Sequence, residues 1–418
     1  MSFANSSRFT KFAISGIATW IGISSAAALP FEDIIRKAAI DSGFTRPEET
    51  YVEVNPALFG PGKALFKSRA LSLNGDISCQ QCHLDQFGSA DGIPNAVAVG
   101  GEGKGAERVM GAGGILPRNT LPFWGRGGKG FDTFFWDGKV DFLGAAKISQ
   151  FGDTPPSDDA IIVADHLPVV EIREMLSETG VVMDNKSEAV TAANNLYREI
   201  ATKLHREEPA ATGQIAAAFG IAATDVQYIH YATALTTFVR SNFRLKTTKF
   251  STFVFDNGEL TPGELEGARL FYGKGKCSTC HSGAYFTDFH FHAVPFPQIG
   301  FGKNGFGIDY GRFNVTQDPG DLYKFRTPPL YNVFKTAPYG HSGSVATVED
   351  AIRVHFDPLS MVDLKKMTAL DRHEFFKRLE SAAGERLLMG YLDDSEVASV
   401  AAFLRALEFD GEPVGDPE

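Results

Sequence analysis

The sequence is short of positive charge and of cysteine. Its 418 residues include 40 lysines and arginines against 51 aspartates and glutamates, a formal net charge of −11 at pH 7. Proteins that bind nucleic acid need a basic surface to neutralise phosphates, so this balance argues against a DNA or RNA partner. Only four cysteines are present, so a site built from cysteine has few candidates. The length suggests two or three domains.

Long apolar runs are also scarce, and the clearest one lies near the amino terminus. Arg8 and Lys11 precede an apolar stretch at 12–23, and three alanines follow at 26–28. The stretch is short for a membrane span, which takes about 20 apolar residues. A positive start, an apolar centre and small residues are typical of a cleaved signal peptide. We therefore predict that residues 1–28 are a signal peptide, that the protein is exported, and that it does not insert stably into a membrane.

The four cysteines form two identical patterns. In an exported protein they would ordinarily suggest two disulfides, and cysteine with histidine also binds zinc. Here, however, each pair is Cys-x-x-Cys followed at once by histidine, at 79–83 and at 277–281. Two thiols at this spacing attach one c-type haem, and the histidine takes the proximal position on its iron. We predict two covalently bound haem c groups, held by the residues Cys79, Cys82, His83, Cys277, Cys280 and His281.

The surroundings of the two motifs are related. Gly-Lys-Ala-Leu-Phe at 62–66 precedes the first motif, and Gly-Ala-Arg-Leu-Phe at 267–271 precedes the second. Thr261 and Pro262 are typical of a helix start ahead of the second. A helix, a loop and a haem motif, repeated, predict a mainly α fold with two cytochrome c-like haem domains and long ordered loops. We expect an N-terminal haem domain at 29–248 and a C-terminal haem domain at 249–418.

The remaining segments fit this plan. Glycine at 100–130 and glycine, proline and aromatics at 286–323 indicate loops, whereas alanine with helical periodicity at 187–245 indicates packing helices. We expect a linker at 246–258, a short helix that begins at Thr347, and a final helix near 394–407.

Six further short motifs follow one another in order. They are Arg-Asn-Thr at 118–120, Phe-Trp-Asp-Gly-Lys at 135–139, Phe-Thr-Asp at 286–288, Phe-Arg-Thr-Pro at 325–328, Thr-Ala-Pro-Tyr-Gly-His-Ser-Gly-Ser at 336–344 and Ala-Thr at 346–347. Together with the haem motifs, over about residues 55–407, the chain resembles the bacterial di-haem cytochrome c peroxidases and their MauG-type relatives.

The resemblance implies a division of labour between the haems. Hydrogen peroxide is expected to react at the N-terminal haem, while the six-coordinate C-terminal haem relays electrons, in the periplasm. Trp136 matches a tryptophan that stands between the haems, although a core aromatic is the usual fate of tryptophan. The family's calcium ion implies the ligands Asn119, Thr336 and Pro338, the last two through backbone oxygen, which suits a hard cation.

The first haem departs from the peroxidase pattern. Peroxidases of this group carry a histidine after the first motif that caps the resting iron. The span from Leu84 to Asn119 contains no histidine, and Met110 is its one soft ligand. We therefore expect the first haem to be permanently open, as in the MauG-type branch.

The second haem departs as well. The family's distal ligand follows the histidine of the Pro-Tyr-x-His motif by fourteen residues, which leads from His341 to His355. Methionine in the peroxidases and tyrosine in the MauG type occupy that position. Val348, Ala351, Ile352 and His355 also share one helical face. We predict that His355 ligates the second iron; His341 and Met361 are the rivals, and a satisfied core histidine is the alternative.

Peroxide cleavage needs an acid–base group near the open iron. The family uses a glutamate before methionine, which Glu174 resembles, and Glu171 is a near alternative; either could instead be a solvated charge. Ala146 stands where some relatives have a distal glutamine. Lys139 and Tyr331 replace two arginines of the family pattern.

The sequence leaves three functions open. A MauG-type enzyme would oxidise side chains of a protein substrate, whereas a detoxifying peroxidase would take electrons from a small redox protein. A non-catalytic di-haem electron carrier, with both irons closed, is the alternative from another class. The missing first-haem ligand argues against the carrier.

Overall fold

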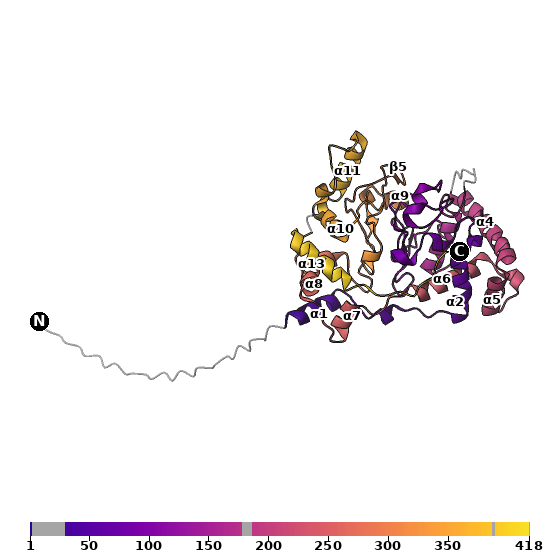
Figure 1. Cartoon of the computed structure of the whole chain (residues 1–418), viewed down its shortest axis with the longest axis horizontal. Helices are drawn as coiled ribbons and strands as arrows, with labels where there is room; N and C mark the ends of the chain where they lie inside the picture. Colours follow the sequence, from indigo (N-terminus) through magenta and orange to yellow (C-terminus); the bar gives the residue numbers. More distant parts are fainter. Residues whose placement is uncertain (2–29, 178–185, 387–388, 418) are drawn as a thin grey trace.

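The computed structural model describes residues 1, 30–177, 186–386 and 389–417, and the predicted signal peptide lies outside them apart from Met1. Two helical lobes lie side by side, one built from the middle of the chain and the other from its later part (Figure 1). The chain is mainly α, as predicted.

The first lobe consists of five α-helices around the first haem motif. They are α2 (Phe59–Lys67), α3 (Ala160–His166), α4 (Lys186–Glu207), α5 (Pro209–Phe219) and α6 (Tyr228–Asn242). Helix α2 packs directly on α6, because Gly62 has no side chain: a Cβ there would lie 2.0 Å from the carbonyl oxygen of Ala234. Beside this contact the rings of Phe66 and Phe238 pack with centroids 5.1 Å apart at 54°.

The second lobe repeats this contact. Its helices are α7 (Lys249–Phe255), α8 (Pro262–Tyr272), α9 (Phe313–Thr316), α10 (Val348–Val354), α11 (Ala369–Ser381), α12 (Ala383–Arg386) and α13 (Asp394–Arg405). A Cβ at Gly267 of α8 would lie 1.9 Å from the carbonyl oxygen of Ser399 in α13. The rings of Phe271 and Phe403 pack 5.1 Å apart at 55°. The sequence repeat is therefore also a repeat of helix packing.

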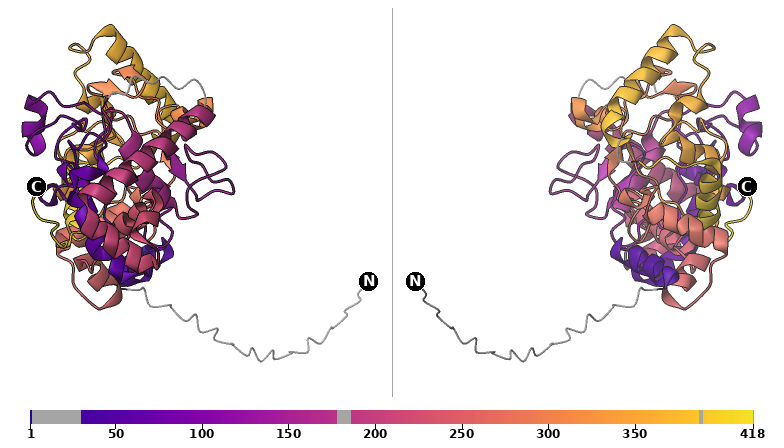
Figure 2. Two further views of the ribbon diagram at one scale, coloured as in Figure 1. Left: turned by 90° about the vertical axis from the view of Figure 1, so that its right-hand side faces the viewer. Right: turned by 90° about the vertical axis from the view of Figure 1, so that its left-hand side faces the viewer.

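The strands are two residues long, and each pair holds neighbouring loop segments together. They form three antiparallel pairs: β1 (Thr133–Phe134) with β2 (Val140–Asp141), β3 (Phe291–His292) with β6 (Phe325–Arg326), and β4 (Phe301–Gly302) with β5 (Gly305–Phe306). Some of the loops that precede α3, drawn in purple, project from the margins of the helical body (Figure 2). Other loops before α3 and those around β3 to β6 meet between the lobes.

Two segments cross between the lobes. Helix α1 (Phe31–Asp41) precedes the first lobe in sequence but packs on α7 and α8, and Ser42 accepts a hydrogen bond from the backbone of Gly283. Residues 408–417 follow α13 but lie on the first lobe, where the Asp85 carboxylate accepts from the backbone amides of Val414 and Gly415 at 3.1 and 2.9 Å. The domain limits at residue 248 stay a prediction.

Most predicted elements are confirmed. Thr261 caps α8 and Thr347 caps α10 through their side-chain oxygens, and α13 is the predicted final helix. The linker expected at 246–258 is wrong, because α7 occupies most of it and buries Phe250 and Phe253 in the core.

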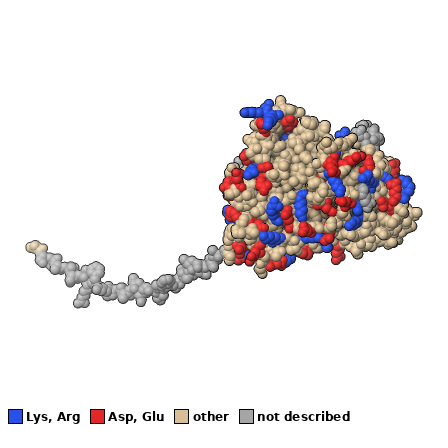
Figure 3. Space-filling view, in the orientation of Figure 1, with Lys and Arg blue, Asp and Glu red and all other residues tan. Residues whose placement is uncertain are grey.

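Charges on the face drawn in Figure 3 are mixed, with acidic and basic side chains interspersed among the described residues. No helix among the described residues is long and apolar enough to cross a membrane.

Candidate haem sites

The first Cys-x-x-Cys-His motif forms a single 3₁₀ turn at Cys79–Gln81, which packs on α2. The Nδ1 atom of His83 lies 2.7 Å from the carbonyl oxygen of Ser89. Burial lowers the pKa of His83 to about 3, so its imidazole is neutral. A neutral ring that donates through Nδ1 leaves Nε2 free for a metal.

The second motif is built in the same way. It forms a 3₁₀ turn at Cys277–Thr279, and His281 Nδ1 lies 3.0 Å from the carbonyl oxygen of Phe286. Burial lowers the pKa of His281 to about 4. This histidine lines a largely apolar cavity of the second lobe, whose wall also includes Cys277, Cys280, Trp136 and His355.

His355 lies across this cavity from His281. Their ring centroids are 6.4 Å apart. One metal between two imidazoles needs about 6 Å, since each metal–nitrogen bond is about 2.0 Å and each ring centre lies about 1 Å behind its nitrogen. His355 Nδ1 lies 2.8 Å from the carbonyl oxygen of Ala351, which leaves Nε2 free. Val348, Ala351 and Ile352 line the same cavity.

The rivals of His355 are placed differently. His341 is buried, stacks on Phe325 with centroids 3.8 Å apart, and has Nε2 2.7 Å from the side-chain oxygen of Gln298. Met361 is not among the residues that line the cavity, although Met389 is.

Candidate ligands for the far side of the first haem are absent from the loop after the motif. Met110 is 89% exposed at the surface. Ala146 is exposed as well. His166 lies close in sequence to Asp165, whose charge acts on Cys79, but Phe151, Tyr197 and Tyr228 surround its ring. These positions support an open first haem.

The two candidate carboxylates differ in their partners. Glu171 Oε2 lies 3.3 Å from the Lys139 ammonium, and this cation lowers the pKa of Glu171 despite burial. The carboxylate of Glu174 forms no hydrogen bond or ion pair with another described residue, and burial raises its pKa. Its charge acts on the thiols of both Cys79 and Cys82.

Trp136 joins the lobes at their boundary. Its Nε1 donates to the backbone oxygen of Asn119 at 2.9 Å, and its own carbonyl accepts from the backbone of Arg326 at 2.8 Å. It lies in the wall of the cavity that His281 and His355 share.

The three predicted calcium ligands lie together beside Trp136. Asn119 Nδ2 is 2.6 Å from the carbonyl oxygen of Pro338, and Thr336 lines the same wall. Turning the Asn119 amide would direct its oxygen to the same point. Three oxygens would supply part of the six to eight that calcium takes, and the calcium site stays a prediction.

Two arginines, the buried Arg326 and the partly exposed Arg126, bear on whether the lobes fit haem. Arg126 and Arg326 contact backbone carbonyls and form no ion pair with a described residue. Burial lowers their pKa values to about 10 and about 9. A buried cation calls for an anion, and each haem carries two propionates. The donor sets and these arginines fit two haems.

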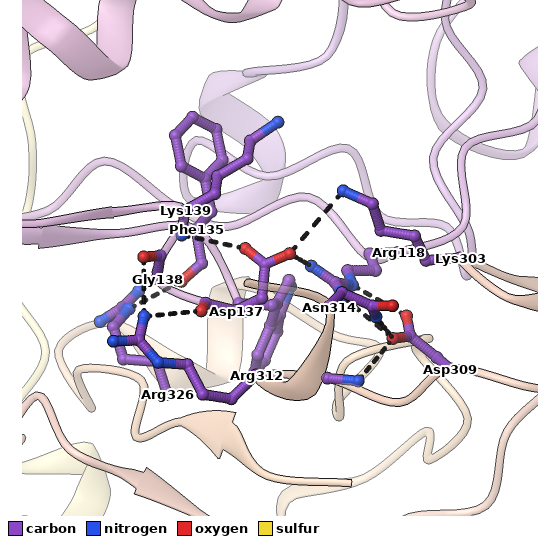
Figure 4. A network of polar contacts seen from close by, with 12 residues as sticks. Arg118, Phe135, Asp137, Gly138, Lys139, Lys303, Asp309, Arg312, Asn314 and Arg326 are labelled. Atoms are coloured by element: carbon purple, nitrogen blue, oxygen red, sulfur yellow. Dashed lines mark hydrogen bonds and ion pairs between the residues drawn. The ribbon is translucent and has the colours of Figure 1, made fainter. Parts of the chain in front are cut away.

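A network of charged groups surrounds Asp137, the residue after Trp136. Arg118 Nη1 lies 2.7 Å from its carboxylate and also pairs with Asp309, while Arg312 donates to its carbonyl oxygen (Figure 4). Burial alone would raise the pKa of Asp137, but the nearby cations Arg118, Lys303 and Lys139 together outweigh it and hold that pKa well below its usual range. This network fixes the backbone beside Trp136.

Sequence reasoning did not find Arg126, Arg326, Lys303 or Met389. Arg326 lies in a quoted motif, and an arginine in an apolar stretch could have signalled a buried anion. The other three have no local signal, because they reach the sites from loops.

Comparisons with known proteins agree with this geometry. A family model described as di-haem cytochrome c peroxidase matches residues 57–259. The chain is 28% identical to the methylamine utilization protein MauG of Methylorubrum extorquens, over 76% of this chain and 75% of that protein. It is 27% identical to cytochrome c551 peroxidase of Pseudomonas aeruginosa, over 70% of each chain.

Solved structures share the fold. The di-haem peroxidase BthA of Burkholderia thailandensis is 18% identical, with a TM-score of 0.62 over 88% of this chain and 89% of that chain. A MauG-like protein associated with microbial copper homeostasis is 22% identical, with a TM-score of 0.61 over 86% and 92%. The chain therefore resembles the di-haem cytochrome c peroxidases and MauG, and this resemblance implies an oxidoreductase with two c-type haems.

Proposed function

We propose that this protein is a periplasmic enzyme of the MauG type, which uses hydrogen peroxide at an open first haem to oxidise a protein partner. The main support comes from the first site. The loop from Leu84 to Asn119 contains no histidine, and its one methionine, Met110, is exposed at the surface. Reduction of peroxide to two waters takes two electrons and two protons. When bound, the haems supply the redox chemistry.

The chain's own residues supply the protons and the path between the lobes. Glu174 is the catalytic acid–base group, because an unpaired carboxylate with a raised pKa can both accept and return a proton. Glu171 is held by Lys139 and is the weaker candidate. Trp136 provides the aromatic bridge, and His281 and His355 would both hold the second haem when it is bound, which would close it to peroxide.

His355 favours the MauG type over a detoxifying peroxidase. Bis-histidine ligation gives a lower potential than histidine with methionine, so the second haem would be a poor acceptor from a high-potential donor. Calcium at Asn119, Thr336 and Pro338 would fix the loop that holds Trp136.

Ligand binding to the oxidised protein tests the proposal. Cyanide should bind, and peroxide should react, without prior reduction, while denatured protein retains two irons after acid–acetone extraction. A requirement for half-reduction would reveal a hidden capping ligand, and the peroxidase alternative would replace the proposal. A protein that binds neither reagent, whether oxidised or half-reduced, would be an electron carrier.

A further inference from the structure

Lys303 belongs to the second lobe by sequence but lies against the first. It occupies the turn between β4 and β5, and its Nζ is 3.8 Å from Asp137 Oδ2. The Asn95 amide donates to the carbonyl oxygen of Phe301 at 3.2 Å and so fastens this hairpin to the first lobe. A cation from one haem domain is thereby held within the charge network of the other.

Lys139 lies on the same side of the Asp137 carboxylate as Lys303, and Arg312 lies on the opposite side (Figure 4). Its ammonium contacts Glu171 at 3.3 Å and lies 4.4 Å from the centre of the Phe135 ring. Only 10% of the side chain is exposed. Burial alone would lower the pKa of Lys139, but Glu171, Glu174 and Asp137 outweigh it and raise the value, so the lysine is charged.

Four charged groups act on Glu174. Lys139, Lys303 and Arg126 are cations that lower its pKa, whereas Glu171 is an anion that raises it. Glu174 shares one turn with Glu171, whose carbonyl oxygen accepts a hydrogen bond from the Glu174 backbone N–H at 3.1 Å, so the ion pair of Glu171 with Lys139 belongs to the same turn. None of the four groups bonds to the Glu174 carboxylate, so they act on it through space. Arg126 comes from the loop before β1, and the two lysines come from different lobes.

We propose that Lys139 and Lys303 are positioning residues that act together, from the two haem domains, on the acid–base carboxylate Glu174. This proposal rests on the proposed role of Glu174. Lys139 keeps Glu171 in place as an ion pair, and Lys303 adds a second positive charge that only the docked second lobe can supply. The first haem site is therefore complete only when the two lobes are assembled.

The pH dependence of cyanide association with the oxidised holoprotein tests this proposal without turnover. The proton of hydrogen cyanide must pass to a base, so the rate should fall as pH falls through the pKa of Glu174. Removing a nearby cation raises that pKa and moves the acid limb to higher pH. We expect Lys139→Met to shift it by about one unit or more, Lys303→Met to shift it less, and Lys139→Arg to restore it.

Lys147→Met is the matched control, because Lys147 forms an exposed ion pair with Asp158 at 2.7 Å and the variant has the same net charge. An acid limb that moves in neither Lys139→Met nor Lys303→Met, relative to this control, overturns the proposal. If Lys139→Met does not fold, the acid limb measured in Lys303→Met decides the test, because Lys303 is partly exposed and its replacement is tolerated more easily. An acid limb that Glu174→Gln leaves unchanged would instead show that Glu174 is not the base, a failure of the proposed function.

Discussion

The two haem motifs are held by the same packing but face different surroundings. In each lobe a glycine lets the helix before the motif touch a later helix, at Gly62 and at Gly267, and a phenylalanine pair seals the contact at 5.1 Å. In each lobe the proximal histidine donates Nδ1 to a carbonyl a few residues further on. The scaffold that positions the haem is therefore duplicated.

The spaces in front of the two histidines are not duplicated. The region around the first contains charged groups such as Glu174, Lys139 and Arg126, whereas the second faces a largely apolar cavity with His355 on its far wall. The first arrangement can move protons, and the second can fill both axial positions of a metal. Packing thus sets where each haem lies, and the loops between the helices set what each haem can do.

Removing the acid–base carboxylate should separate the two surroundings most strongly. Glu174→Gln should slow the reaction with peroxide by about 100- to 10,000-fold, because proton transfer is lost while the haem stays accessible. Stopped-flow absorption at the haem band measures the rate. Glu171→Gln is the matched control and should change it less than about tenfold. A larger loss in Glu171→Gln would assign the catalytic role to Glu171.

The shared scaffold predicts equal damage to both lobes. Gly62→Ala and Gly267→Ala should each destabilise the protein by about 1–3 kcal/mol, since the new methyl group would overlap a backbone carbonyl. Gly213→Ala, where a Cβ meets nothing within 4 Å, should instead stabilise helix α5 by up to about 1 kcal/mol. Denaturant unfolding followed by circular dichroism gives the three values. Unequal losses at Gly62 and Gly267 would mean that the repeat is not equivalent.

Changing the second haem's far ligand should leave the first haem unaltered. His355→Met should raise the potential of the second haem by a fraction of the roughly 0.8 V that axial ligands span, and it should add the sulfur-to-iron absorption band. Met110→Ala is the control and should change neither haem. If His355→Ala retains the low-spin spectrum, then the ligand is another residue, and Met389 is the first to examine.

A substitution at Trp136, which lies at the boundary of the lobes, tests whether the two haem sites act together. Trp136→Phe should retain both haems and their separate spectra but weaken the sharing of oxidising equivalents after peroxide addition, because the indole and its hydrogen bond to Asn119 are lost. Spectra of the second haem after peroxide addition report the sharing. Unchanged spectra and turnover would return Trp136 to an ordinary core role.

Calcium removal should give the smallest effect. The backbone oxygen of Asn119 holds Trp136, and its side chain is a predicted calcium ligand, so a chelator should loosen Trp136 without displacing it. Haem coupling should weaken less than in Trp136→Phe and recover when calcium is added back. If the protein is shown to contain calcium and chelation leaves the haem coupling unchanged, then calcium does not contribute to the role of Trp136.

The sequence predicted what depends on local spacing. The attachment motifs, the cap at Thr261 and the shared helical face of His355 are all encoded within a few residues of one another, so counting along the chain suffices. Helix α7 was missed because lysines and threonines precede it, although Phe250, Phe253 and Val254 at i, i+3 and i+4 carry the helical pattern.

Contacts between distant loops could not be predicted in this way. Lys303 and Asp137 are far apart in sequence and meet only because the β4–β5 hairpin docks on the first lobe. The roles of Glu171 and Glu174 also depend on which of them Lys139 reaches. No periodicity in the sequence indicates these contacts between loops, because they depend on how the two lobes pack.

Residues 408–417 are among the last to be synthesised, and they contact the first haem motif, which is made much earlier. This segment leaves the ribosome after both haem motifs, yet it lies on the first, where Asp85 holds two of its amides and Gln80 bonds to the carbonyl oxygen of Gly415. This side of the first motif therefore stays uncovered until the last residues of the chain have been made. Haem can be attached to Cys79 and Cys82 during that interval, and the arriving segment then covers the finished junction.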